Sequence, residues 1–193
     1  MSISRSIGMV RVRPAWDIEV PALLARVLGV IFSVVLMGLG AHVKFFLPGN
    51  PVPVTLQTFF VLLAGALLGA RAGVAAVALY ITLGVAGLPM FAGAGAAGVA
   101  YLLGPTGGYL AGFLVAAALV GGLARRVKSL LGLALVFVVA EIVLLLMGAL
   151  HLSLWLRLGV GKGFALGFVP FLYGDVVKAA AAFVLFILLD RRR

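Results

Sequence analysis

The chain has 193 residues, of which 65% are hydrophobic and 10% charged, with a mean hydropathy of +1.30. An average soluble domain is about half apolar and about a quarter charged, so this composition nearly excludes a soluble globular protein. The net charge of +10 does not indicate nucleic-acid binding, because the Lys and Arg residues fall between apolar stretches rather than on a soluble face. The sequence therefore predicts an integral membrane protein whose surface contacts membrane lipid.

Apolar runs of roughly 20 residues, the length that crosses a bilayer, recur along almost the whole chain. When they are divided at Gly, Pro and charged residues, they predict an all-α membrane protein with six transmembrane helices. The second and third spans are short and separated only by residues 70–72, so we expect a tight helical hairpin, with Pro89 ending the third span. The predicted spans are Val20–Gly40, Thr55–Gly69, Gly73–Met90, Thr106–Ala124, Leu130–His151 and Gly167–Leu189.

The basic residues predict the orientation in the membrane, because basic loops stay in the cytoplasm. Ten Lys and Arg residues fall on the side of both termini, and only Lys44, Arg157 and Lys162 fall on the other side. Both termini are therefore predicted to be cytoplasmic, which an even number of spans allows. The predicted regions are a cytoplasmic N-terminal segment at 1–19, a six-helix domain at 20–189 and a basic cytoplasmic tail at 190–193. The outward loops are Ala41–Val54, Phe91–Pro105 and Leu152–Leu166.

Few charged residues lie inside the predicted spans, where each ionised side chain costs at least ~2.5–3.5 kcal/mol on insertion scales. Asp175 and Lys178 are three residues apart, which places them on one helix face and within pairing distance. They are either a structural ion pair or the polar end of a pocket for a ligand that displays N–H and C=O together. Glu141 stands alone in an apolar run, and a buried, hydrogen-bonded or protonated carboxyl is as compatible with it as a ligand contact.

A stripe of small residues follows one face of the first span. Ala25, Gly29 and Ser33 repeat at four-residue spacing, an arrangement that lets another helix approach closely. Such stripes are common in membrane proteins rich in Gly and Ala. The stripe serves either internal packing or the docking of another subunit.

The glycine-bearing segment FAGAGAAGVAYLLGPTGGYL does not match a phosphate-binding loop, because it lacks the GxxxxGK[ST] pattern. Its glycines let the backbone fold closely over a small ligand, and Phe91, Tyr101 and Tyr109 offer apolar walls and hydroxyl groups. The chain has no cysteine, and its two histidines, His42 and His151, form no metal-ligand spacing. The sequence also shows no pairing of a catalytic nucleophile with a general base. It therefore does not predict an enzyme.

Five motifs, taken together and in order, closely resemble the BioY family, the biotin-specific substrate-binding components (S-components) of energy-coupling factor (ECF) transporters. The similarity extends over roughly residues 51–182, and its specificity lies in the combination. One departure is that the segment FAGAGAAG carries alanines where many relatives have a denser glycine loop. The motifs are PVPVTLQTF at Pro51–Phe59, LLGARAG at Leu67–Gly73, GLPMFAG at Gly87–Gly93, LGPTGGYLAGF at Leu103–Phe113 and GDVVKA at Gly174–Ala179.

The resemblance implies a protein in the cytoplasmic membrane of a bacterium. It implies that this protein captures biotin from outside with high affinity for uptake across that membrane. It also implies a transmembrane coupling protein and two ABC-type ATPases as partners, with ATP used by those subunits and no cofactor in this chain. The alternative within the family is a solitary, homo-oligomeric biotin transporter. In the family, the residues that match Asp175 and Lys178 contact the biotin head group, and the stripe of Ala25, Gly29 and Ser33 matches a docking face for the coupling protein.

The remaining contacts expected from the resemblance come from the loops and the span that follows the first loop. Apolar walls are expected from the aromatic residues, and the biotin carboxylate is expected to be held by loop amides or by Gln57. The candidate biotin-binding residues besides the charged pair are therefore Gln57, Phe91, Gly93, Tyr101, Gly108 and Tyr109.

Overall fold

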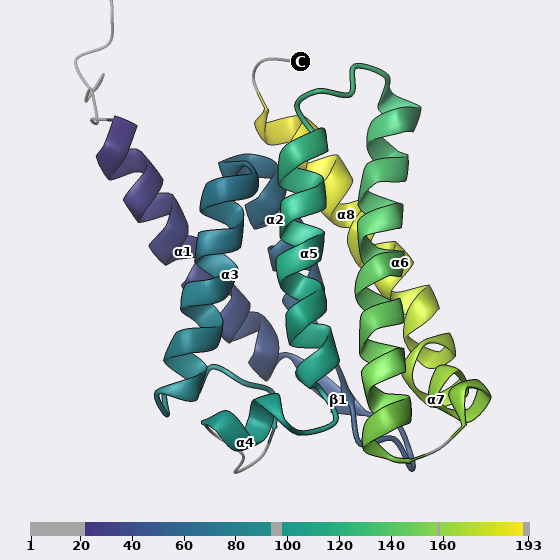
Figure 1. Cartoon of the computed structure of the whole chain (residues 1–193). Helices are drawn as coiled ribbons and strands as arrows, with labels where there is room; N and C mark the ends of the chain where they lie inside the picture. Colours follow the sequence, from purple (N-terminus) through teal and green to yellow (C-terminus); the bar gives the residue numbers. More distant parts are fainter. Residues whose placement is uncertain (1–21, 94–97, 158, 191–193) are drawn as a thin grey trace, which may run out of the picture.

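The computed structural model describes residues 22–93, 98–157 and 159–190, which form a bundle of long helices (Figure 1). The predicted N-terminal segment 1–19 and residues 191–193 of the predicted tail lie outside the described residues. The long helices are α1 (Ala22–His42), α2 (Gln57–Leu68), α3 (Ala70–Val85), α5 (Gly107–Leu123), α6 (Leu130–Trp155) and α8 (Val169–Leu189). The short elements are α4 (Val99–Leu102), α7 (Val160–Gly167), and the strands β1 (Lys44–Phe46) and β2 (Pro53–Thr55).

The long helices coincide with the six predicted spans, which confirms the predicted fold class of an all-α, multi-pass membrane protein. Within the described residues, four helical stretches are long and apolar enough to cross a membrane, and α5 is a shorter apolar helix. One of the four stretches, Gln57–Val85, contains both α2 and α3. The six-helix count therefore depends on the chain reversing its direction between them.

The reversal occurs at Gly69, which has φ +81° and ψ 170°, a conformation that favours glycine. A Cβ atom on Gly73 would lie 2.8 Å from the Cα of Gly65, so the two helices fold back on each other at van der Waals distance. The predicted hairpin is confirmed, but its connector is one residue rather than three, because residues 70–72 already belong to α3.

The third span is shorter than predicted, because α3 ends at Val85 rather than near Met90. Gly87 adopts φ +99°, which a right-handed helix does not allow. The chain thus leaves the helix before Pro89, and the proline follows the helix end instead of causing it.

The loops that the sequence predicts to face outward form a structured layer at the end of the bundle that is opposite the C-terminus (Figure 1). β1 and β2 make an antiparallel hairpin in which Lys44 pairs with Thr55. The Asn50 amide in the tip of this hairpin donates to the carbonyl of Leu166 in α7 at 2.7 Å. The Lys44 ammonium donates to the carbonyl of Ala92 at 2.5 Å. These contacts tie the three outward loops into one cover over the helices.

Candidate ligand-binding site

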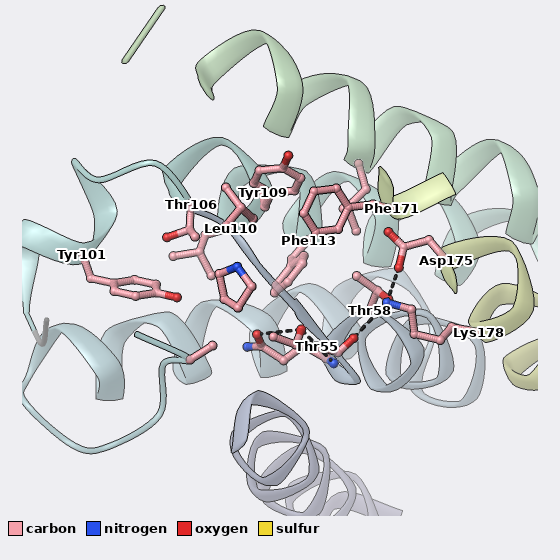
Figure 2. A pocket seen from close by; sticks show the side chains of 15 residues that line it. Thr55, Thr58, Tyr101, Thr106, Tyr109, Leu110, Phe113, Phe171, Asp175 and Lys178 are labelled. Atoms are coloured by element: carbon pink, nitrogen blue, oxygen red, sulfur yellow. Dashed lines mark hydrogen bonds and ion pairs between the residues drawn. The ribbon is translucent and has the colours of Figure 1, made fainter. Parts of the chain in front are cut away.

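A pocket with an empty volume of about 450 Å³ lies beneath the outer layer. This volume is in the range of about 300–1,000 Å³ that small-molecule sites occupy. Figure 2 shows that the pocket is elongated, with Asp175 and Lys178 at one end, Tyr101 at the other, and Leu110, Phe113 and Phe171 between them. The lining residues are Val52, Pro53, Thr55, Gln57, Thr58, Ala92, Tyr101, Thr106, Tyr109, Leu110, Phe113, Leu144, Phe171, Asp175 and Lys178.

One end of the pocket carries the charged pair of α8. Lys178 and Asp175 form an ion pair, as their spacing predicts. The Lys178 ammonium also donates to the backbone carbonyl of Thr55 at 2.8 Å, just before α2 begins. Asp175 is 2% exposed, so the pair is removed from bulk water, where its electrostatic interactions are strong. The two side chains present an acceptor and a donor side by side to the pocket.

The opposite end carries uncharged hydroxyl groups and backbone. The Tyr101 hydroxyl, on α4, faces the side chain of Thr106 and the backbone of Ala92 and Gly93. Burial raises the pKa of Tyr101, so its hydroxyl remains a neutral donor at physiological pH. This end can therefore hold an anionic or strongly polar group of a ligand through hydrogen bonds.

Two threonine hydroxyls in the lining are buried without a hydrogen bond of normal geometry to any described residue. They belong to Thr58 at the start of α2 and Thr106 just before α5. An unpaired buried hydroxyl is costly, at about 1–3 kcal/mol, and native proteins usually satisfy such groups. Thr58 lies beside the carboxyls of Asp175 and Glu141, and Thr106 lies beside the Tyr101 hydroxyl, so each end of the pocket has a hydroxyl that can bond to these neighbours or to a polar ligand.

The middle of the pocket is apolar and is held in place by contacts between helices. Leu110 and Phe113 of α5, Leu144 of α6 and Phe171 of α8 form its walls. The ring of Tyr109 also lines it, while the Tyr109 hydroxyl donates to the carbonyl of Gly167 at 2.5 Å. That hydroxyl therefore fastens α5 to α7, so Tyr109 contributes an apolar wall rather than a free donor.

Of the eight candidate ligand-binding residues, five line the pocket, namely Asp175, Lys178, Gln57, Tyr101 and Tyr109. Gln57 is already engaged, because its amide nitrogen donates to the Tyr80 hydroxyl and its amide oxygen accepts from Thr55 at 3.1 Å.

Phe91, Gly93 and Gly108 are not among the lining residues. The Phe91 ring stacks on the Tyr101 ring, with centroids 4.4 Å apart and planes at 7°, so it supports the wall from behind. A Cβ on Gly108 would lie 2.2 Å from the Cβ of His151, which makes Gly108 a packing residue between α5 and α6. The backbone of Gly93 lies beside the hydroxyl group of Tyr101.

The sequence analysis missed several residues of the lining, above all Thr55, Thr58, Thr106, Phe113 and Phe171. One signal was available for Phe171, which lies four residues before Asp175 and seven before Lys178 and so shares their helix face. Thr106 and Phe113 belong to the motif LGPTGGYLAGF, from which only Gly108 and Tyr109 are predicted as ligand contacts. Thr58 carries no signal in the sequence, because its role depends on how α2 packs against α8.

The small-residue stripe of α1 is partly used for internal packing. A Cβ on Gly29 would lie 2.8 Å from a methyl carbon of Leu68 in α2. The Ser33 hydroxyl donates to the carbonyl of Gly29 within the helix at 2.8 Å. Ala25 is exposed, as are large apolar residues beside it such as Leu28 and Phe32. The outer part of this helix face is thus open to lipid or to another subunit.

Comparison with known proteins gives a consistent result. A sequence model described as the BioY family matches residues 13–193. The probable biotin transporter BioY of Pyrococcus horikoshii is 40% identical over 161 residues, covering 81% of this chain and 90% of that protein. The biotin transporter BioY of Thermotoga maritima is 36% identical, covering 70% of this chain and 79% of that protein. These relatives are transporters and not enzymes.

A solved structure shares the architecture and about a quarter of the aligned residues. The crystal structure of the S-component for biotin from an ECF-type ABC transporter superposes with a TM-score of 0.80 at 26% identity, covering 89% of this chain and 93% of that chain. Transporter relatives and several membrane-crossing helices place the protein in the cell membrane as a multi-pass integral protein. The matched family model, the relatives and the shared fold together show that the chain belongs to the BioY family.

Proposed function

We propose that this chain captures biotin from outside the cell and delivers it as the substrate-binding subunit of an ATP-driven ECF transporter. The biotin assignment is supported by relatives that are named as biotin transporters and by a structural neighbour that is a biotin S-component. The observation that carries the proposal most strongly is the pocket, in which a charged pair, an apolar middle and a hydroxyl-rich end follow one another.

This order of groups matches the order of groups along biotin. The ureido ring has two N–H donors and one carbonyl acceptor, so Asp175 accepts an N–H while Lys178 donates to the carbonyl. The fused rings and the thioether lie against Phe113 and Phe171, which remove their apolar surface from water. The carboxylate of the side chain then reaches Tyr101 and the hydroxyls and loop amides around it.

The binding step needs no cofactor in this chain, because capture here is non-covalent. The energy for release inside comes from ATP hydrolysis by two ABC-type ATPases, transmitted through a coupling protein in the membrane. The exposed face of α1 at Ala25, with the neighbouring stripe positions Gly29 and Ser33, is the proposed contact for that coupling protein. Close helix approach at small residues supports this assignment.

Uptake measurements distinguish an ECF subunit from a solitary homo-oligomeric transporter. In cells that lack their own biotin transporters and every coupling-module subunit, we expect this chain alone to bind labelled biotin without accumulating it. Co-expression of a matching coupling protein and its ATPases is expected to restore accumulation, and replacing the ATP-binding lysine of the ATPases should abolish it. Accumulation by the chain alone, above the external concentration, would instead establish the solitary transporter.

A further inference from the structure

Glu141 is a buried acid that the proposed biotin contacts do not use. It lies in the middle of α6, is 2% exposed, and neither of its carboxyl oxygens has a hydrogen bond of normal geometry to a described residue. It is not part of the pocket lining. An unpaired buried carboxylate is among the most costly groups that a protein can contain, and a neutral carboxyl is much less so. Its presence in an otherwise apolar segment therefore needs a specific reason.

The surroundings of Glu141 supply that reason. Its carboxyl interacts with Asp175 and Lys178 of α8 and with the hydroxyl of Thr58 of α2. Asp175 in turn interacts with Lys178, Thr58 and Glu141, and Tyr109 of α5 lies within electrostatic range of Asp175. On α7, which also packs against α6, Lys162 is exposed. The charged end of the pocket thus continues behind Asp175 into a second carboxyl group.

The charges in this cluster do not balance if both acids are ionised. Two carboxylates would face the single ammonium of Lys178, which also donates to the Thr55 carbonyl. One negative charge would then be buried without a partner, at a cost of several kcal/mol. A proton shared between the two carboxyls removes this charge, and Asp175 is the one that directly contacts Lys178. Charge balance therefore favours a proton on Glu141 over one on Asp175.

We propose that Glu141 is a positioning residue that holds its proton and donates it in a hydrogen bond to Asp175. This hydrogen bond holds the Asp175 carboxylate between Lys178 and the pocket. The oxygen lone pairs that Glu141 and Lys178 do not use then face the ligand. The predicted effect of Glu141 on binding rests on the proposed function. The predicted protonation of Glu141 is independent of that function. Sequence spacing could not reveal the contact, because Glu141 and Asp175 are on different helices.

Infrared spectroscopy tests the protonation directly on the purified chain in detergent at mildly alkaline pH. We expect the carbonyl stretch of a protonated carboxyl in the wild-type protein, its loss in Glu141→Gln, and a shift of the same band when biotin is added. A spectrum without that band in the wild type would overturn the proposal, whether or not biotin binds.

Binding measurements test the positioning. Glu141→Leu, which removes the donor at similar volume, is expected to weaken biotin binding about 10–100-fold, the equivalent of one hydrogen bond to a charged group. Its melting temperature should stay close to that of the wild type, because an apolar side chain that packs well in place of a buried polar one offsets the lost hydrogen bond. Glu141→Gln, which retains a donor, should recover the affinity to within about threefold.

The outcomes separate the alternatives. Equal affinity of Glu141→Leu and wild type would show that Glu141 has no part in binding. A loss in Glu141→Gln as large as in Glu141→Leu would show that a neutral donor at this position is not enough, and would overturn the positioning role. If the wild type itself fails to bind biotin, the proposed function fails, and the infrared band still decides the protonation of Glu141.

Discussion

Neutralising either member of the charged pair is expected to abolish tight biotin binding. Asp175→Asn removes the acceptor charge and leaves the Lys178 ammonium without its counter-ion. Lys178→Met removes the donor and leaves a buried carboxylate unpaired. Removing one partner of a buried, hydrogen-bonded charge pair in a binding interface costs about 2–5 kcal/mol of binding free energy, which corresponds to a loss of affinity of about 30-fold or more. Isothermal titration calorimetry or equilibrium dialysis with labelled biotin measures this loss.

Matched controls separate the loss of the site from general damage to the protein. Lys128→Met changes an exposed lysine far from the pocket lining in the same way as Lys178→Met and should leave the affinity unchanged. Gly174→Ala adds a methyl group beside Asp175, where a Cβ would meet no atom within 4 Å. This variant should also leave the affinity for biotin unchanged. Wild-type affinity in both Asp175→Asn and Lys178→Met would remove the charged pair from the binding site.

A single methyl group at Gly121 is expected to destabilise the whole bundle. A Cβ there would lie 2.4 Å from the backbone nitrogen of Ala70 and 2.6 Å from the carbonyl carbon of Gly69, at the turn between α2 and α3. Because these are backbone atoms, α5 must move away from the hairpin. Overpacking of this kind costs up to about 3 kcal/mol, so Gly121→Ala should lower the melting temperature in detergent by about 6–12 °C.

The adjacent residue provides the control. A Cβ on Gly122 would meet no atom within 4 Å, and alanine is about 1 kcal/mol more favourable than glycine inside a helix. Gly122→Ala should therefore melt at or slightly above the wild-type temperature. If the two variants melt at the same temperature, then the close contact of α5 with the hairpin does not hold the helices together.

The fold was largely predictable because its determinants are local in the sequence. Apolar runs locate the six spans to within a few residues, and the prolines and glycines locate most of their ends. The main differences arise where a glycine backbone conformation decides the boundary. Gly69 turns the chain one residue before α3 begins, and Gly87 ends α3 early, and neither conformation can be read from hydropathy.

The site was predictable only where one helix carries the pattern or where a family resemblance supplies it. Asp175 and Lys178 share one turn of α8, so their pairing follows from spacing alone. Thr58 and Glu141 join them from α2 and α6, through helix packing that no local pattern specifies. Gly108, a glycine in a motif predicted to contact the ligand, is not among the pocket-lining residues and packs against His151.

Equilibrium binding to the purified, full-length chain tests the central claim that this pocket recognises biotin through its ureido ring. We expect saturable, one-to-one binding of biotin and only slightly weaker binding of desthiobiotin, which keeps both the ureido group and the carboxylate. Diaminobiotin, which lacks the ureido carbonyl, should bind at least about 100-fold more weakly, because it offers no carbonyl to Lys178 and its amines bring positive charge beside that ammonium. Absence of saturable biotin binding, or equal affinity for biotin and diaminobiotin, would contradict the account.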